Sequence, residues 1–302
     1  MSVFIGSVEA SRIALRTILD CAFNLDAIVT LPPEKASRHS DYVDLSDYAR
    51  DAGVELIFSS QINSKTTLSK IGDLDPDYIF IIGWSQIFKS EGLSLAKIGS
   101  IGFHPSLLPK NRGRAVIPWT ILQNIKTTGT SLFWLDPEVD SGDLLAQREF
   151  EVDALETAES LYGKHMTCLD SILREVLPKL KKKEYPRLAQ DDKSATYCAK
   201  RTEEDGLIDW EQNAEAICRL VRAVSKPYPG AFSFYGSDKV IFWKAKYITN
   251  NNYWGTPGQI QEILEDKILV ACGDQTLLEV SDIEWASLDS NAVLKKHNKF
   301  KN

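Results

Sequence analysis

Two side chains in this sequence have the chemical types needed for acid–base catalysis, and they lie 36 residues apart. His104, one of only four histidines, follows an apolar run that begins at Ile101 and directly precedes Pro105. Asp140 begins the turn-like sequence Asp-Ser-Gly-Asp. A histidine can gain or lose a proton near neutral pH, and a carboxylate beside it orients the imidazole and favours its charged form. Considered separately, His104 could simply end a strand and Asp140 could simply form a turn.

The residues around His104 predict where it lies in a fold. A following proline pushes the histidine backbone towards the extended region, which suits the last residue of a strand. Residues 105–113 contain two prolines, a glycine and basic side chains, so they are expected to form an ordered loop. Open α/β sheets bind their ligands outside the carboxyl ends of their strands, and the sequence places His104 there.

The run His104-Pro-Ser-Leu-Leu-Pro-Lys-Asn-Arg-Gly113, with Asp-Ser-Gly-Asp from Asp140, resembles the formyltransferases that use N10-formyltetrahydrofolate. This superfamily includes methionyl-tRNA formyltransferase, sugar-nucleotide N-formyltransferases, glycinamide ribonucleotide transformylase and the hydrolase domain of formyltetrahydrofolate dehydrogenase. The resemblance implies a catalytic Asn, His and Asp. The histidine falls on His104 and the aspartate on Asp140, whereas the asparagine position is Gly102. The missing asparagine is a departure from the family pattern.

The chemistry implied by the resemblance explains why that departure matters. A neutral amine attacks the formyl carbon and forms a tetrahedral oxyanion, which needs preorganised hydrogen-bond donors. Gly102 has no side chain to donate, and losing one such donor costs about 10²–10³ in rate. Ser106, Asn111, a backbone N–H or a water could replace it. Otherwise the activity is weaker than that of the family, or different.

The resemblance also implies where the two substrates bind. In related enzymes the segment after the strand at 78–82 lines the pterin pocket, largely through backbone contacts, and an apolar slot with exposed amides suits a flat ring. We assign N10-formyltetrahydrofolate to Trp84, Gln86, Ile87, Phe88, Leu107, Asp136 and Asp140. We assign the acceptor to Arg12, Ser106, Lys110, Asn111, Arg112, Lys200 and Arg201. Two alternatives remain: Ile87 and Phe88 could be the buried face of the next helix, and Gly6-Ser7 could form a tight turn rather than an anion site near Arg12.

Hydrophobic patterning predicts an α/β fold in the first part of the chain. Short apolar runs, expected as strands at 1–6, 25–31, 55–58 and 78–82, alternate with helical patterns at 7–20, 45–52 and 66–72. Strands at 130–135 and 147–152 and a long helix at 157–180 follow. We therefore predict a Rossmann-like, doubly wound, mainly parallel sheet for residues 1–184.

The second part of the chain predicts a smaller β domain. Residues 185–205 are polar and turn-rich, and we expect them to be a linker. Residues 206–302 then contain a helix at 213–224 and five short strands separated by turn signals, at 232–235, 240–247, 258–265, 267–272 and 276–280. This pattern suits a small open barrel and resembles the OB-like C-terminal domain of the family.

Composition limits the classes of protein that fit. A hydrophobic content of 43% and a charged content of 25% describe a soluble globular chain. The five cysteines are scattered without metal-ligand spacing, so we expect reduced thiols, a cytoplasmic location and no metal site. We find no leader pattern and no apolar run long enough to span a membrane. The net charge of −7 argues against a nucleic-acid partner.

Several functions remain open within the family. Residues 205–302 hold 13 acidic and 11 basic side chains, and the loop at 34–44 has no positive excess, so tRNA binding is disfavoured. A sugar nucleotide needs only a few basic groups, and we expect an amino-deoxy sugar nucleotide as the acceptor. The alternatives are methionyl-tRNA formyltransferase, 10-formyltetrahydrofolate hydrolase (whose domains also lack the asparagine) and a non-catalytic folate-binding relic. A homodimer formed through sheet or barrel edges is also possible on sequence grounds.

Overall fold

The computed structural model describes residues 1–38, 41–248, 252–287 and 293–301. The chain forms two compact units, each built from separated stretches of sequence. The first unit comprises Met1–Val116, Thr127–Glu151 and Gly163–Ala199, and the second comprises Ile117–Lys126, Val152–Tyr162 and Lys200–Asn302. The domain ranges expected from the sequence (1–184, 185–205 and 206–302) are continuous, unlike these units, and they stay a prediction.

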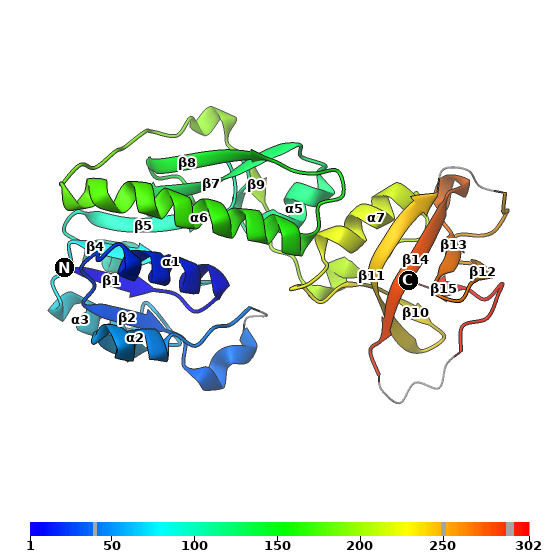
Figure 1. Ribbon diagram of the computed structural model, residues 1–302, viewed down its shortest axis with the longest axis horizontal. Helices are drawn as coiled ribbons and strands as arrows, with labels where there is room; N and C mark the ends of the chain where they lie inside the picture. The colour runs from blue at the N-terminus through cyan, green and yellow to red at the C-terminus, as the bar shows by residue number, and fades with distance from the viewer. Residues whose placement is uncertain (39–40, 249–251, 288–292, 302) are drawn as a thin grey trace. The chain divides into compact units, whose positions relative to one another are not determined.

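The first unit is built on a seven-stranded sheet with the order β3-β2-β1-β4-β5-β7-β8 (Figure 1). The five strands on the β3 side are parallel, whereas β7 and β8 are antiparallel to their neighbours. The strands are β1 Ser2–Ile5, β2 Ala27–Thr30, β3 Glu55–Phe58, β4 Tyr78–Ile81, β5 Gly99–His104, β7 Thr127–Trp134 and β8 Leu144–Glu151. The predicted mainly parallel α/β fold is confirmed, and each strand expected in this region is present within a few residues.

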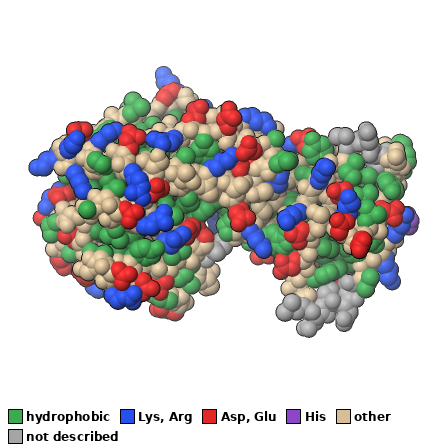
Figure 2. Space-filling model, viewed as in Figure 1, with side chains coloured by type: hydrophobic (Ala, Val, Ile, Leu, Met, Phe, Trp, Pro, Cys, Tyr) green, Lys and Arg blue, Asp and Glu red, His purple; other side chains and the backbone are tan. Residues whose placement is uncertain are grey.

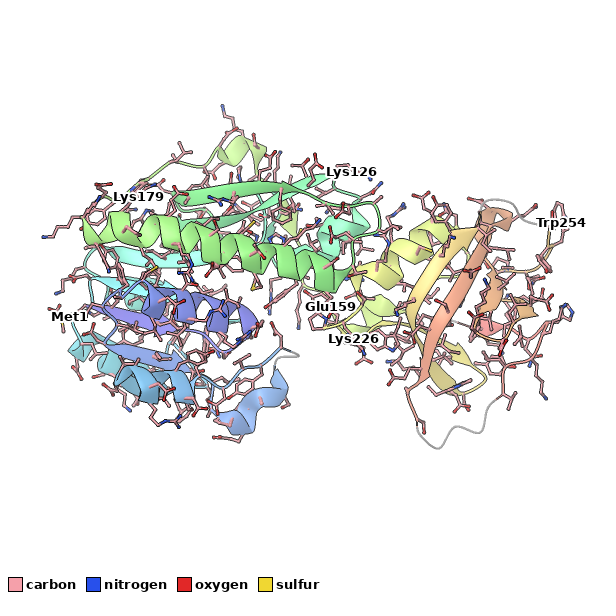
Figure 3. All side chains as sticks on the ribbon, in the orientation of Figure 1. Met1, Lys126, Glu159, Lys179, Lys226 and Trp254 are labelled. Atoms are coloured by element: carbon pink, nitrogen blue, oxygen red, sulfur yellow. The ribbon has the colours of Figure 1, made fainter. Side chains whose placement is uncertain are left out.

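Four α-helices lie between the parallel strands: α1 Glu9–Asp20, α2 Ser46–Ala52, α3 Lys65–Asp73 and α4 Ser90–Leu93. Helix α5 (Val116–Leu122) precedes β7 and falls mostly in the second unit, and α6 (Ala158–Lys181) follows β8 and begins in the second unit. Helices α1 and α6 lie side by side (Figure 1), where the Thr17 hydroxyl donates to Asp170 Oδ1 at 2.6 Å. Helix α6 ends in basic residues that complement its dipole. One of them, Lys179 (Figure 3), donates from Nζ to Glu175 Oε1 at 2.8 Å.

Tight turns follow two of the parallel strands at the carboxyl edge of the sheet. After β1 and β4 the chain makes turns at Gly6 and Gly83, and these turns approach each other through the Ser11 side chain. A Cβ on either glycine would lie 2.4 Å from Ser11 Oγ, so only glycine fits there. Ser11 Oγ accepts from the backbone N–H of Ser7 and donates to the carbonyl of Ile82. This contact fixes the start of α1 relative to the end of β4.

The second unit contains a six-stranded antiparallel sheet with the order β12-β13-β14-β11-β10-β15. Its elements are α7 Ala214–Ala223, β10 Ala231–Tyr235, β11 Asp238–Ile248, β12 Ile260–Ile263, β13 Ile268–Ala271, β14 Leu277–Trp285 and β15 Phe300–Lys301. A bridge between Gln259 and Lys299 joins the two edges, so the sheet curls round on itself. The OB-like character predicted for this region is confirmed, and β15 is a strand that the sequence pattern did not predict.

A small third sheet has no counterpart in the sequence-based prediction. It pairs β6 (Arg112–Gly113) in parallel with β9 (Tyr197–Cys198). Strand β9 comes from the segment expected to be a linker, and within the first unit it lies against the loop that follows His104. Among the described residues, no helix is long and apolar enough to cross a membrane.

Candidate active site

His104 is the last residue of β5, at the edge of the sheet where β4 and β5 both end. Its side chain is only 6% exposed. The loop after it folds back, so that His104 Nε2 lies 2.7 Å from the backbone oxygen of Asn111. A carbonyl oxygen can only accept, so Nε2 must carry the proton and the neutral imidazole is bare at Nδ1. The loop backbone thereby selects one tautomer of His104.

Asp140 lies against the bare nitrogen of that imidazole. Its Oδ2 is 3.5 Å from His104 Nδ1 and accepts from the backbone N–H of Gly113 at 2.8 Å. Asp140 has a φ of 53°, a left-handed conformation that aspartate tolerates better than most residues. Within the described part of the chain, Asp140 Oδ1 has no hydrogen-bond partner. The carboxylate is therefore anchored through one oxygen and can accept a hydrogen bond through the other.

Asn111 is held on the same loop by a threonine from a distant part of the chain. Thr196 Oγ1 accepts from the Asn111 backbone N–H at 2.8 Å and therefore donates its own hydrogen to Asn111 Oδ1, at 3.2 Å. This pair of bonds determines which way the Asn111 amide points. The nitrogen Nδ2 is left without a partner among the described residues, which makes it a spare donor on the residue whose backbone carbonyl contacts His104.

The position of the family asparagine is filled by apolar side chains. A Cβ built on Gly102 would lie 2.6 Å from Leu135 Cδ2 and 3.1 Å from the Phe133 ring. Phe133 belongs to a small hydrophobic cluster with Leu108 and Leu144, against which Leu135 packs. The space beside Gly102 is therefore occupied and is not kept open for a substrate.

Residues 32–177 match the formyl transferase family, and residues 200–298 match the formyl transferase C-terminal domain. The chain belongs to the formyl transferase family. It is 30% identical over 290 residues to the bifunctional polymyxin resistance protein ArnA of Wigglesworthia glossinidia brevipalpis, covering 96% of this chain and 43% of that protein. The chain thus spans less than half the length of that curated relative.

Solved structures share the fold of this formyl transferase. The N-formyltransferase from Helicobacter canadensis, in complex with folinic acid and dTDP-3-aminofucose, matches with a TM-score of 0.67 and 17% identity over 93% of this chain and 98% of that one. Methionyl-tRNA formyltransferase from Clostridium thermocellum matches with a TM-score of 0.61 and 20% identity over 95% and 99%. At these identities the likeness shows the fold alone.

In this formyl transferase, several residues predicted to contact substrates are already bonded within the protein. Arg112 is only 1% exposed; its guanidinium donates to Gln190 Oε1, to Asp192 Oδ1 at 2.6 Å and to the Tyr197 hydroxyl. The Ser106 hydroxyl donates to the backbone oxygen of Lys110 at 2.7 Å. Arg112 and Ser106 therefore stabilise the loop, which argues against their expected contact with the acceptor, whereas the Lys110 side chain is exposed.

Three further cations expected at the acceptor site are also placed by the structure. Arg12 forms an ion pair with Glu9, and the nearby N–H of Ser7 is bonded to Ser11, so this turn does not resemble an anion site. Lys200 and Arg201 belong to the second unit. Lys200 is exposed, whereas Arg201 lies 5.0 Å from the centre of the Trp119 ring and donates to the Asp205 carbonyl.

The predicted folate segment is only partly available to a ligand. Phe88 is 5% exposed and belongs to the core of the sheet, so it is the buried residue that the alternative interpretation described. The Gln86 amide is bonded to the backbone of Ser60 and Ile62. In contrast, Ile87 is 67% exposed, so its side chain is available to a ligand. Trp84 packs against the core, and its Nε1 is buried without a partner among the described residues.

The remaining predicted contacts organise the neighbouring loops. Asp136 Oδ1 accepts from the Ser141 hydroxyl and from the Glu138 backbone N–H, which fixes the turn that carries Asp140. Leu107 packs over Gly129, where an added Cβ would lie 2.4 Å from Leu107 Cδ2. Sequence reasoning missed Gln190 and Thr196, which contact the loops of Asp140 and Asn111. Neither residue lies in a motif, so no local signal could have identified them.

Proposed function

We propose that this formyl transferase moves a formyl group from N10-formyltetrahydrofolate to the amine of an amino-deoxy sugar nucleotide. The observation that carries the proposal is the triad of His104, Asp140 and Asn111 at the carboxyl edge of the sheet, with the imidazole held in one tautomer. In the transfer, a bond forms between the acceptor nitrogen and the formyl carbon, and the bond from that carbon to N10 breaks.

The proposed carrier of the proton transfers is His104 Nδ1. In the neutral imidazole this nitrogen is bare, so it can take the proton that the attacking amine loses. The resulting imidazolium then donates from Nδ1 to the Asp140 carboxylate and from Nε2 to the Asn111 carbonyl. The proton can afterwards pass to the leaving N10. The free Oδ1 of Asp140 can accept from the amine and orient it before attack.

Asn111 Nδ2 is the proposed replacement for the missing donor at Gly102. The loop folds back far enough to place Asn111 beside His104, and Thr196 leaves its amide nitrogen unpaired. Ser106, the other candidate, uses its hydroxyl hydrogen on Lys110. A preorganised amide donor directed at the developing oxyanion is worth about 10²–10³ in rate.

The folate is proposed to bind along the segment after β4. Trp84 packs partly against the core of the sheet and forms the inner wall of this segment. Exposed Ile87 offers apolar surface to a flat ring. The structure of the related Helicobacter canadensis enzyme with folinic acid supports this choice of formyl donor.

Charge supports a sugar nucleotide over tRNA as the acceptor. On the face shown in Figure 2, acidic and basic side chains are interspersed. The protein carries a net charge of −7. Arg112, a basic residue beside the site, is already bonded to Asp192 within the protein. Binding many backbone phosphates needs an excess of positive charge, whereas a diphosphate needs little. The dTDP-3-aminofucose bound by the Helicobacter canadensis enzyme belongs to the proposed acceptor class.

One assay distinguishes the proposal from its alternatives. Purified protein is given 10-formyltetrahydrofolate, with and without a panel of amino-sugar nucleotides, and release of tetrahydrofolate is followed. We expect acceptor-dependent release and a formylated sugar nucleotide in the mass spectrum. Release without acceptor would indicate a hydrolase, and tight folate binding without release would indicate a folate-binding relic. Formylation of Met-tRNA at rates matching the best sugar nucleotide would contradict the choice of acceptor.

A further inference from the structure

A short segment of the first unit, residues 188–198, runs past both loops of the active site and is called the strap here. Leu188 and Leu144 exchange two backbone hydrogen bonds, of 2.8 and 3.0 Å, beyond the Asp140 loop. At its other end, β9 pairs with β6 directly after Asn111. The strap therefore contacts the loop of Asp140 and the loop of Asn111 with ordered backbone.

Gln190 connects the strap to the Asp140 loop through its side chain. Its Nε2 donates to the backbone oxygens of Asp140 and Gly142, at 2.9 and 2.7 Å. Its Oε1 accepts from the buried guanidinium of Arg112. The amide cannot rotate without losing both sets of bonds, so it holds the Asp140 backbone in its left-handed conformation.

Thr196 connects the strap to His104 through Asn111. The Thr196 hydroxyl binds both the backbone N–H and the side-chain oxygen of Asn111. The backbone carbonyl of Asn111 in turn meets His104 Nε2. The strap backbone reinforces this contact, because the Arg112 N–H donates to the Thr196 carbonyl at 2.8 Å. Thr196 therefore holds the peptides on both sides of the Asn111 Cα. Its hydroxyl binds the Asn111 N–H, and its carbonyl binds the Arg112 N–H of the peptide whose carbonyl meets His104.

We propose that the strap is a positioning element of the transfer reaction, in which Thr196 sets the His104 tautomer and the Asn111 amide, and Gln190 sets the backbone of Asp140. The inference rests on the proposed roles of His104, Asp140 and Asn111. Neither Thr196 nor Gln190 touches the reacting atoms, so both are positioning residues. A misplacement of about 1 Å in such a site can cost a hundredfold in rate.

The tautomer of His104 can be measured without any turnover. In long-range ¹H–¹⁵N spectra of the wild-type protein, the neutral imidazole should show a protonated Nε2 and a bare Nδ1. The His104 signals are assigned by their loss in His104→Gln. Thr196→Val keeps the side-chain shape and removes the hydroxyl. We expect its His104 ring nitrogens to shift towards the values of a tautomer mixture, and Thr196→Ser to restore the wild-type pattern.

Kinetics supply the second measurement. We expect Thr196→Val to lower kcat about tenfold or more with an unchanged KM for the folate, and Thr196→Ser to recover most of the loss. Gln190→Glu keeps an acceptor for Arg112 but removes both donors, so kcat should fall in the same way. Ser194→Ala is the matched control, because Ser194 also lies in the strap but its hydroxyl donates only to Asp191 Oδ2.

Unmoved His104 signals in Thr196→Val would overturn the proposal. A loss of kcat as large in Ser194→Ala as in Thr196→Val would also overturn it, since the strap would then act only through stability. If the protein transfers no formyl group to any sugar nucleotide while Thr196→Val shifts the His104 signals, the function proposed above fails and the positioning contact stands.

Discussion

Two buried histidines lie on opposite faces of the same sheet, and their surroundings differ. His104 pairs across the β5–β7 ladder with Ser131, so the two side chains share one face. Thr130, the residue before Ser131, points to the other face, where its hydroxyl lies 2.9 Å from Nδ1 of His165 on α6. His104 is 5% exposed and His165 is 0% exposed, so burial alone does not distinguish them.

Their partners do distinguish them. His104 has a carbonyl 2.7 Å from one ring nitrogen and a carboxylate oxygen 3.5 Å from the other, so its charged form has a stabilising group on both sides. His165 has one hydroxyl, an aromatic neighbour in Phe150 and an Nε2 without a partner among the described residues. Burial lowers the pKa of His165 to about 3, so it is neutral at physiological pH. A buried histidine can carry protons in a reaction only where the fold stabilises its charged form at both ring nitrogens.

The largest effect is expected from removing the reactive imidazole. His104→Ala should lower kcat by about 10²–10⁴-fold while folate binding is retained, because the proton acceptor is lost and the Trp84 segment is untouched. Steady-state kinetics and folate titration measure the two properties. His297→Asn, at an exposed histidine of the second unit, is the matched control and should be unchanged. A His104→Ala enzyme that keeps more than about a tenth of kcat would contradict the assignment.

The carboxylate is the next point at which the two histidines differ. Asp140→Asn keeps the shape and the acceptor for Gly113 but removes the negative charge beside Nδ1. We expect kcat to fall by about 10²-fold or more, and the double variant with His104→Ala to be little worse than His104→Ala alone. Additive losses, measured as a double-mutant cycle, would show that the two residues act independently.

Restoring the family asparagine is expected to weaken the protein. In Gly102→Asn the new side chain meets Leu135 and Phe133, and overpacking a filled site costs about 1–3 kcal/mol. We expect a lower unfolding midpoint in urea and no gain in kcat. Asn111→Ala should lower kcat by about 10²–10³-fold. A clear rise in kcat for Gly102→Asn, together with a harmless Asn111→Ala, would refute the assignment of Asn111 as the replacement donor.

The smallest effect concerns His165 and stability. The folded-state pKa of about 3 lies below the ordinary value of 6.5, so the unfolded chain binds the extra proton first. The contribution of His165 to the free energy of unfolding is present in full well above pH 6.5. It falls as the pH is lowered, and the loss at pH 5 is about 2 kcal/mol. His165→Gln cannot titrate, so its free energy of unfolding should depend less on pH between 7 and 5. Equal pH slopes for the two proteins would exclude this contribution, and kcat should change little.

The elements that carry the site could be predicted from sequence because their signals are local. The β-branched run at 78–82, the proline after His104 and the turn residues after Asp140 act through sterics and short-range periodicity. These signals placed His104 and Asp140 at loop starts, and the structure brings them within 3.5 Å of each other. The resemblance assigned Phe88 to a ligand, and the local pattern left its burial open, because an apolar residue in a core and one in a binding slot look alike in sequence.

What only the tertiary structure decided depends on contacts between residues far apart in the chain. Arg112 resembled a substrate-binding cation in a basic loop, yet it is bonded to Asp192, 80 residues away. The segment at 185–205 is polar and rich in turn residues, and such composition does not distinguish a linker from a strap that binds catalytic loops. In the sequence, Gly102 shows only that a side chain is missing. In the structure, Leu135, which directly follows β7, fills the space beside it. The sequence determined which groups could react, because side-chain chemistry and local backbone preference depend on each residue and its near neighbours in the chain. Their tautomer, orientation and availability were decided by long-range packing and hydrogen bonds, which leave no local pattern.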